Sequence, residues 1–289
     1  MKKTKKFHKL LNKWYEQNQI DFAWQNTQNP YHALVAGFCA QQTQITRVIQ
    51  IWKKIIHKYP ELKDIAKAET SDLLIIWSNT GYPKRIINLK KTCEIILNKY
   101  NGKIPLEKEH LLNLPGVGPY TASIIECYGY KKNIPAIDIN FERILGRFFL
   151  GKNKKNNNLD KILDDLSKIN QFSFWNPAIM DFGALICKSK PKCEICILNK
   201  NCSAFINNIE MKIKSEQIEF HGSNRYYRGK ILKNLRERKN NNIQIDKLYL
   251  ELEQLPDKLR FQELLIDLNK DDLIWIKGNK IGLGANKKN

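Results

Sequence analysis

Four cysteines late in the chain form the pattern that points most clearly to chemistry. They fall within sixteen residues as C-x5-C-x2-C-x5-C, at Cys187, Cys193, Cys196 and Cys202. Structural zinc sites usually combine two short pairs separated by a longer spacer, so zinc is the alternative assignment. Four thiolates in one short loop are typical of iron–sulfur ligation. The spacing therefore favours a [4Fe–4S] cluster.

One aspartate, Asp138, could act on a sugar. It follows Pro135 in "NIPAIDINFERILGRF" and precedes a segment with helical apolar spacing. Aspartate is common at helix N-termini, so a purely structural capping role is one reading. The other is a carboxylate that stabilises positive charge at C1′ of a reacting sugar, or that orients water. Asn140 could support Asp138 in that role.

A glycine-rich turn separates two helical segments in "LNLPGVGPYTASII", residues 112–125. Leu114 and Val117 can pack inward, while Gly116 and Gly118 allow positive φ and close approach of another backbone. The backbone N–H groups would then face outward at the start of the next helix, which suits a DNA phosphate. A tight helix–helix turn is the alternative.

Short amphipathic helices must position these residues. Apolar side chains recur with i, i+3, i+4 spacing in four segments, 47–59, 70–77, 85–100 and 106–114. Strand-like alternation appears only near the C-terminus, around Gly278-Asn279, where it predicts a hairpin. Three short helices are predicted before it, at 225–238, 245–255 and 260–272. Together these elements indicate a small winged-helix-like module.

We therefore expect an all-α core followed by this module. The expected boundaries are a core at 1–205, divided into a six-helix part at about 20–130 and a cluster part at 1–19 with 131–205, a linker at 206–224, and the module at 225–289. The polar stretch 151–160 is expected to be a solvated loop.

The formal charge of +20 and the pI of about 9.6 favour a polyanionic partner. An AT-rich genome that overuses Lys, Ile and Asn is an alternative cause, and an acidic membrane surface is a weaker alternative partner. The chain has no apolar run of transmembrane length and no signal peptide. We expect an intracellular monomer, cytoplasmic and nucleoid-associated, or nuclear in a eukaryote.

Taken together, the motifs resemble the helix–hairpin–helix base-excision DNA glycosylases, most of all the adenine glycosylases of the MutY type. The resemblance extends from about Trp24 to Cys202. It rests on five strings in order, "FAWQNTQNPYHALVAG", "QQTQ", "LPGVGPYTA", "IDINFERIL" and "MDFGALIC…KPKCEICILNKNC". It implies the helix–hairpin–helix glycosylase fold, a [4Fe–4S] cofactor, and duplex DNA with a mismatch or damaged base as partner.

The resemblance also implies a role for each motif residue. Asp138 would be the catalytic carboxylate, with Asn140 as its neighbour. Tyr120 stands where lyase-type relatives carry a lysine nucleophile, and because a phenol cannot form an imine, the enzyme should be monofunctional. The implied DNA contacts are a wedge beside the extruded base from Gln41, Gln42 and Tyr82, a phosphate site at Gly116, Val117 and Gly118, and further contacts from Lys84 and Arg85.

Three departures from the family pattern bear on activity. The first cysteine gap is one residue short, and Pro83 replaces a tyrosine in the wedge loop. The most serious is Gly37, which stands where the family has the glutamate that protonates the departing adenine. Losing a general acid should lower the rate on the order of 10²–10⁴-fold. Glu126 is an unpromising substitute, since it lies about 120° around its helix from Tyr120.

The expected function is monofunctional excision of a mispaired adenine, opposite guanine or 8-oxoguanine, from duplex DNA. Uracil or thymine departs more easily as an anion, so a uracil/thymine mismatch glycosylase is one alternative. A catalytically impaired homologue that binds DNA lesions is the other. The presence of Asp138 argues against the impaired homologue, because binding alone does not require this carboxylate.

Overall fold

The chain forms two compact units in the computed structural model. The first comprises residues 1–37, 106–112 and 117–215, and the second comprises 38–105, 113–116 and 216–289. The structure describes residues 1–20, 25, 28–41, 43, 45–78, 80–152, 159–210, 219–252 and 257–285. None of the helices within these ranges has the length and apolar character needed to cross a membrane.

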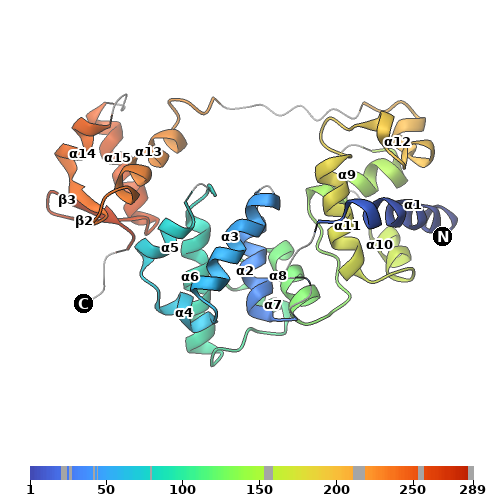
Figure 1. The fold of residues 1–289 in the computed structure, drawn as a ribbon, viewed down its shortest axis with the longest axis horizontal. Helices are drawn as coiled ribbons and strands as arrows, with labels where there is room; N and C mark the ends of the chain where they lie inside the picture. The colour runs from blue at the N-terminus through green and yellow to red at the C-terminus, as the bar shows by residue number, and fades with distance from the viewer. Residues whose placement is uncertain are drawn as a thin grey trace. The chain divides into compact units, whose positions relative to one another are not determined.

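An aromatic core organises the first unit. Phe7, Leu11 and Trp14 line one face of the N-terminal helix at i, i+4, i+7 spacing and are buried. Phe7 stacks on Trp175 with ring centroids 5.8 Å apart, and Trp14 meets Phe182 edge-on at 4.9 Å. The helices around this core are α1 (Lys2–Asn18), α9 (Ile139–Leu145), α10 (Asp160–Ser167) and α11 (Phe172–Leu185), as Figure 1 shows.

Further helices of the first unit precede or follow the glycine turn and the cysteine loop in the sequence. They are α7 (Lys108–Leu112), α8 (Pro119–Ile124) and α12 (Ser203–Ile206), and α2 (Pro30–Ala40) contributes its residues up to Gly37. Each of α8 and α9 continues into one turn of π-helix, at Ile125–Gly129 and Gly146–Leu150. This unit therefore holds Asp138, Tyr120 and all four clustered cysteines.

The second unit contains four helices before the C-terminal module, α3 (Ile45–Lys58), α4 (Leu62–Lys67), α5 (Thr70–Ile76) and α6 (Lys84–Lys99). The apolar periodicity predicted three of them, α3, α5 and α6, but not α4. Ile86, Leu89, Cys93 and Ile96 give α6 a fully buried face at spacings of three, four and three residues. The unit carries the predicted wedge residues and the glycine turn as far as Gly116.

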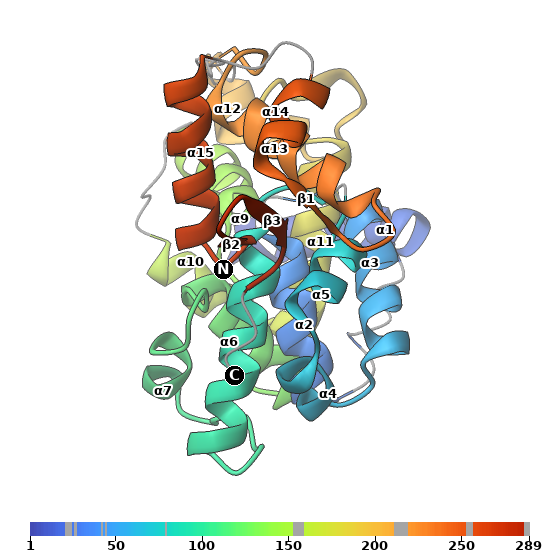
Figure 2. The ribbon, with the colours of Figure 1, turned by 90° about the vertical axis from the view of Figure 1, so that its left-hand side faces the viewer.

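The C-terminal module contains the predicted three helices and hairpin, and one strand that the sequence did not reveal. Asn242–Gln244 forms strand β1, which pairs with β3 and gives the antiparallel order β1-β3-β2. Ile243 lies opposite Ile281, and both side chains are buried, which fixes this register. In chain order the elements are α13 (Asn224–Arg236), β1, α14 (Ile245–Glu251), α15 (Lys258–Lys270), β2 (Ile274–Lys277) and β3 (Lys280–Leu283), as in Figure 2. The winged-helix assignment stays a prediction.

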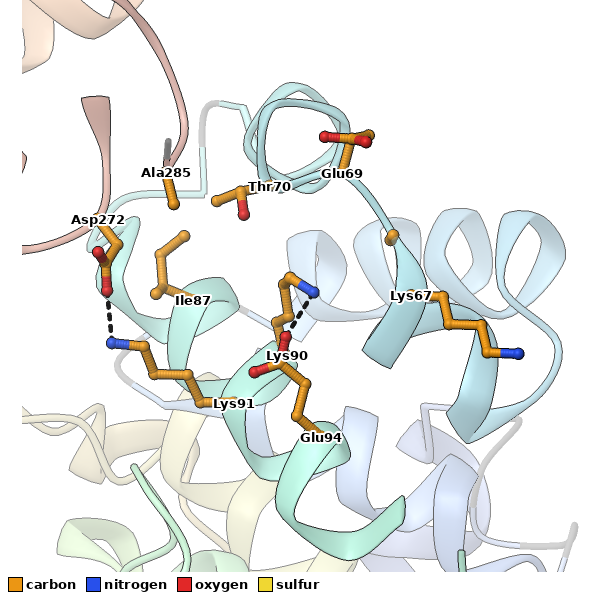
Figure 3. Close-up of a pocket in the computed structure, with 10 residues that line it drawn as sticks. Lys67, Glu69, Thr70, Ile87, Lys90, Lys91, Glu94, Asp272 and Ala285 are labelled. Atoms are coloured by element: carbon orange, nitrogen blue, oxygen red, sulfur yellow. Dashed lines mark hydrogen bonds and ion pairs between the residues drawn. The ribbon is translucent and has the colours of Figure 1, made fainter. Parts of the chain in front are cut away.

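This module packs against α5 and α6 within the second unit. Lys91 Nζ lies 2.5 Å from a carboxylate oxygen of Asp272, and Figure 3 shows this ion pair at the edge of a pocket between α6 and the module. Gly284 has a φ of +90°, and a Cβ there would lie 2.8 Å from the backbone nitrogen of Ser71. By their contacts, residues 216–289 fall in one compact unit with 38–105, and the domain boundaries expected from the sequence stay a prediction.

Candidate active site and nucleic-acid interface

Asp138 caps the N-terminus of α9 through one of its carboxylate oxygens. Its Oδ1 accepts hydrogen bonds from the backbone N–H groups of Asn140 and Phe141, both at 2.9 Å. Its Oδ2 accepts from the side-chain Nδ2 of Asn140 at 2.6 Å. The structural and catalytic readings of Asp138 are therefore compatible, because the capping bonds hold the partly buried carboxylate in one orientation.

Asn140 is itself held by a residue that the sequence analysis missed. Its Oδ1 accepts from Arg143 Nη2 at 2.6 Å, and Arg143 Nε donates to the carbonyl of Cys187 at 2.7 Å. On α11, Gly183 leaves room for the amide, since a Cβ there would lie 2.7 Å from Asn140 Oδ1. The i, i+3 spacing of Asn140 and Arg143 was the available sequence signal.

Burial raises the pKa of Asp138 above its ordinary value, and the hydrogen bonds from Phe141 and Asn140 and the charge of Arg143 oppose this rise. A carboxylate that must be ionised to stabilise positive charge would therefore lose activity at a higher pH than an exposed aspartate. The hydrogen bonds from Asn140 limit this loss, because they favour the ionised form of Asp138.

We expect the variant Asn140→Ala to move the acid limb of the pH–rate profile to higher pH. The substitution removes the Nδ2 hydrogen bond that lowers the pKa of Asp138 and leaves burial, which raises it. Single-turnover base release measured across the acid range gives the midpoint directly. An unchanged midpoint with a lower plateau would mean that Asn140 only orients the carboxylate.

Tyr120 lies near Asp138 and carries no amine for imine chemistry. Burial, and next the negative charge of Asp138, raise the pKa of its phenol above the ordinary value, so the hydroxyl stays protonated. The hydroxyl donates to Met180 Sδ at 3.7 Å. A protonated phenol in this position can donate a hydrogen bond, but it cannot attack a sugar carbon as a lysine amine can.

Gly37 packs directly against Thr121 on α8. A Cβ built at Gly37 would lie 2.8 Å from Thr121 Cγ2, a distance that real Cβ contacts essentially never show. Thr121 is itself buried, at 1% exposure, so its methyl group has little freedom to move away. The position of the family's acid is therefore closed by packing in this chain, and the sequence alone could not reveal that Thr121 closes it.

Two buried carboxylates of the first unit are bound to structural partners. Glu126 Oε1 pairs with Lys132 Nζ at 3.0 Å, and its Oε2 has no hydrogen-bond partner within the described part of the chain. Asp181 Oδ2 accepts from the backbone N–H of Ile20 at 3.1 Å, and burial raises the pKa of this carboxyl to about 7. The pairing with Lys132 agrees with the expectation that Glu126 does not replace the missing acid.

In the second unit, the buried side chain of Arg85 connects the two segments that carry the predicted wedge residues. It is buried, and its guanidinium donates to the carbonyls of Thr80 and Gly81 at 3.1 Å, to the carbonyl of Gln41, and to Thr43 Oγ1 at 2.9 Å. With its donors directed inward, Arg85 positions the loop, in place of the surface DNA contact that the sequence suggested.

The predicted wedge residues Gln41 and Tyr82 belong to the segments that Arg85 contacts. Gln41 Nε2 donates to the carbonyl of Gly116 at 3.0 Å, which joins it to the glycine turn. Tyr82 has a φ of +45° and is 47% exposed, and Lys84 pairs with Asp271 at 2.7 Å. Gln42, the third predicted wedge residue, lies outside the described residues.

The glycine turn has a strict requirement at one of its two glycines. Gly116 has a φ of +77°, and a Cβ there would lie 2.9 Å from Phe38 Cε1. Thr92 Oγ1 fixes the turn by donating to the carbonyl of Pro115 at 2.8 Å. Gly118 has an ordinary φ of −93° and precedes α8, and none of the described residues comes within 4 Å of the place where a Cβ would stand. Val117 packs inward, as predicted.

The four clustered cysteines lie close enough for their charges to interact. Burial, together with the neighbouring charges of Cys187, Cys193 and Cys202, raises the pKa of the Cys196 thiol to about 12. Three of the four pack against the aromatic core. Within the described residues, however, no group of three or more His, Cys, Asp or Glu side chains is arranged as a metal site.

Comparison with known proteins gives a consistent family. The profile of "HhH-GPD superfamily base excision DNA repair protein" matches residues 35–168. The adenine DNA glycosylase of Buchnera aphidicola subsp. Baizongia pistaciae is 32% identical over 74% of this chain, and the match spans only 63% of that relative's length. The thymine/uracil-DNA glycosylase of Methanothermobacter thermautotrophicus is 31% identical, over 71% of this chain and 95% of that protein.

A solved structure agrees with these matches. A thermostable thymine-DNA glycosylase superposes with a TM-score of 0.63 at 31% identity, covering 71% of this chain and 98% of that one. The matched residues include Gly37, the glycine turn and Asp138. The match to the Methanothermobacter protein, at 31% identity, extends over 95% of that protein. The chain therefore belongs to the HhH-GPD superfamily of base excision DNA repair proteins.

Proposed function

We propose that this chain is a monofunctional DNA glycosylase, which hydrolyses the N-glycosidic bond of a mispaired base in duplex DNA. The observation that carries the proposal is the Asp138 carboxylate, fixed by two backbone N–H groups and by Asn140. Three hydrogen bonds preorganise its charge, so little reorganisation is needed when positive charge develops on the substrate.

In this mechanism the base departs as the bond to C1′ lengthens and the sugar acquires oxocarbenium character. The ionised Asp138 stabilises that charge, and water adds to C1′. The protonated hydroxyl of Tyr120 near the carboxylate forms no imine. The product is an intact strand that carries an abasic site.

A mispaired adenine opposite guanine or 8-oxoguanine is the leading substrate, because the chain resembles adenine DNA glycosylases. The packing of Gly37 against Thr121 favours a second candidate, uracil or thymine in a mismatch with guanine. Those bases depart more easily as anions and need less protonation. The third possibility is a DNA-lesion binder without activity, and the intact bonds around Asp138 argue against it.

The decisive experiment is single-turnover excision on duplexes containing A:G, A:8-oxoG, T:G or U:G, with alkali used to reveal abasic sites. Release of adenine would reject the pyrimidine proposal, and release of uracil or thymine alone would reject the adenine proposal. Tight binding without release would reject both. Strand scission without alkali would contradict the monofunctional assignment.

We further propose that Cys187, Cys193, Cys196 and Cys202 hold a [4Fe–4S] cluster. Support comes from the donor set, four cysteines of one short loop whose charges interact, and from the packing of three of them against the core. When bound, the cluster would cross-link the loop and hold it rigid. The lysines of that loop would then face DNA phosphates from a fixed position, and they are Lys188, Lys190, Lys192 and Lys200.

Purified protein should contain about four iron atoms per chain and absorb broadly in the visible range. We expect Cys196→Ser to lose iron, because the thiolate ligand is removed. Cys127→Ser is the matched control, since Cys127 lies outside the loop and accepts a hydrogen bond from Asn176 Nδ2 at 3.3 Å, which a hydroxyl can also do. Zinc in place of iron, or full iron content in the Cys196 variant, would contradict the proposal.

A further inference from the structure

A groove lies within the second unit between the loop at 80–83 and helix α13. Its volume is about 560 Å³. Arg225, Gly229 and Lys233 recur at i, i+4, i+8 and bring one face of α13 to it. The opposite wall comes from Tyr82 and its loop, and from Arg47 on α3.

The groove is strongly basic. Arg47, Arg225, Lys233 and Arg236 all line it, and its described lining contains no aspartate or glutamate. Lys233 Nζ lies 3.7 Å from an oxygen of Glu237, which follows the last residue of α13. Exposed i, i+4 ion pairs of this kind contribute little. Four positive side chains around one open groove match a polyanionic strand.

Aromatic side chains stand among these charges. Tyr82 and Phe220 are 47% and 50% exposed, which is high for such large apolar rings. The Arg225 guanidinium lies 5.0 Å from the centroid of Tyr82 and 5.5 Å from that of Phe220. Exposed aromatic rings interleaved with arginine are typical of surfaces on which nucleic-acid bases stack.

The middle of the α13 face is left open by a glycine. Among the residues that the structure describes, nothing lies within 4 Å of a Cβ built at Gly229, so their packing does not require glycine there. Glycine within a helix lowers its stability relative to alanine. An unfavourable residue that keeps the groove open is consistent with a ligand that occupies it.

We propose that this groove binds one unstacked nucleotide of the DNA, with its base against Tyr82 and Phe220 and its phosphates beside the four basic side chains. The inference rests on the proposed glycosylase function and gives the C-terminal module a part in it. The nucleotide could come from the strand opposite the excised base, or from beside the lesion on the same strand. Both sources present the same chemistry, a flat base with a phosphate.

The probe is a duplex containing a tetrahydrofuran abasic analogue, with 2-aminopurine placed either opposite the analogue or next to it. We expect the wild type to change the fluorescence of one of these two probes, which identifies the strand. In Gly229→Leu the side chain would fill the groove, and this variant should bind about tenfold more weakly and lose that change. It should fold at least as well, because leucine is the better helix former.

The double variant Lys233→Gln/Arg236→Gln tests the phosphate contacts. The slope of log K against log salt concentration should become shallower by about two, since each contact contributes about 0.9. Lys230→Gln is the matched control, because Lys230 is on α13 but does not line the groove. Its slope should stay within about half a unit of the wild type.

Unchanged affinity and fluorescence in Gly229→Leu, or slopes that do not distinguish the double variant from Lys230→Gln, would overturn the inference. Failure of the glycosylase proposal gives a different result, namely no base release by the wild type on any mismatch. If the wild type releases a base while all groove variants bind and react like it, only the groove assignment is lost.

Discussion

Replacing Asp138 by asparagine should lower the single-turnover rate of base release on the order of 10³-fold. The amide has the size of the carboxylate but carries no charge to stabilise the developing oxocarbenium ion. Its oxygen can still accept from the N–H groups of Asn140 and Phe141, and asparagine caps helices about as well as aspartate. The new amide places a donor opposite Asn140 Nδ2, so that one hydrogen bond is lost and stability should fall by about 1 kcal/mol, while the main loss should be chemical.

Asp257→Asn provides the matched control. Asp257 is the N-cap of α15, and its Oδ1 accepts from the backbone N–H of Arg260 at 3.0 Å. The same chemical change is thus made at a second helix cap, in the C-terminal module. We expect thermal unfolding to be nearly unchanged in Asp257→Asn and only slightly lowered in Asp138→Asn, and excision to fail only in Asp138→Asn. Full activity of Asp138→Asn would exclude Asp138 as the catalytic carboxylate.

Local patterns in the sequence predicted the parts of the site that depend on neighbouring residues. The buried face of α6 follows from apolar spacing, and the requirement for Gly116 follows from the turn between two helices. Asp138 at the start of α9 was predicted both as a cap and as a candidate for catalysis, and its geometry is compatible with both. Each of these inferences required only a short stretch of chain.

Most of the parts that escaped prediction depend on contacts between distant segments. Arg143 reaches the carbonyl of Cys187 across 44 residues, and Arg85 reaches the carbonyl of Gln41 across 44. Nothing in the composition of α6 distinguishes Arg85, which is buried, from the exposed Lys84 beside it. Strand β1 likewise forms by pairing with β3. Its three residues are too few to show an alternation of apolar and polar side chains in the sequence.

Restoring the family's acid should require two substitutions together. Gly37→Glu alone should destabilise the protein by about 1–3 kcal/mol, because its Cβ would be forced against Thr121 Cγ2. It should gain little adenine excision, since the carboxyl cannot reach its place without distorting α2. Thr121→Ala removes the obstructing methyl group. Thr121→Ala on its own should leave the excision rate close to that of the wild type.

In the double variant Gly37→Glu/Thr121→Ala, we expect adenine excision from A:G and A:8-oxoG duplexes to rise on the order of 10²–10⁴-fold. Gly37→Gln/Thr121→Ala is the matched control, because it has the same shape and no acidic proton. U:G excision should change little, since uracil needs less protonation.

The cycle of single and double variants separates two explanations of Gly37. If the clash with Thr121 is what closes the acid's position, the gain must appear only in the double variant, as a large non-additive term. A gain in Gly37→Glu alone would show that Thr121 yields easily. No gain in the double variant, with its fold intact, would mean that adenine is not held beside this helix. The leaving group would then be a pyrimidine that departs without help from position 37.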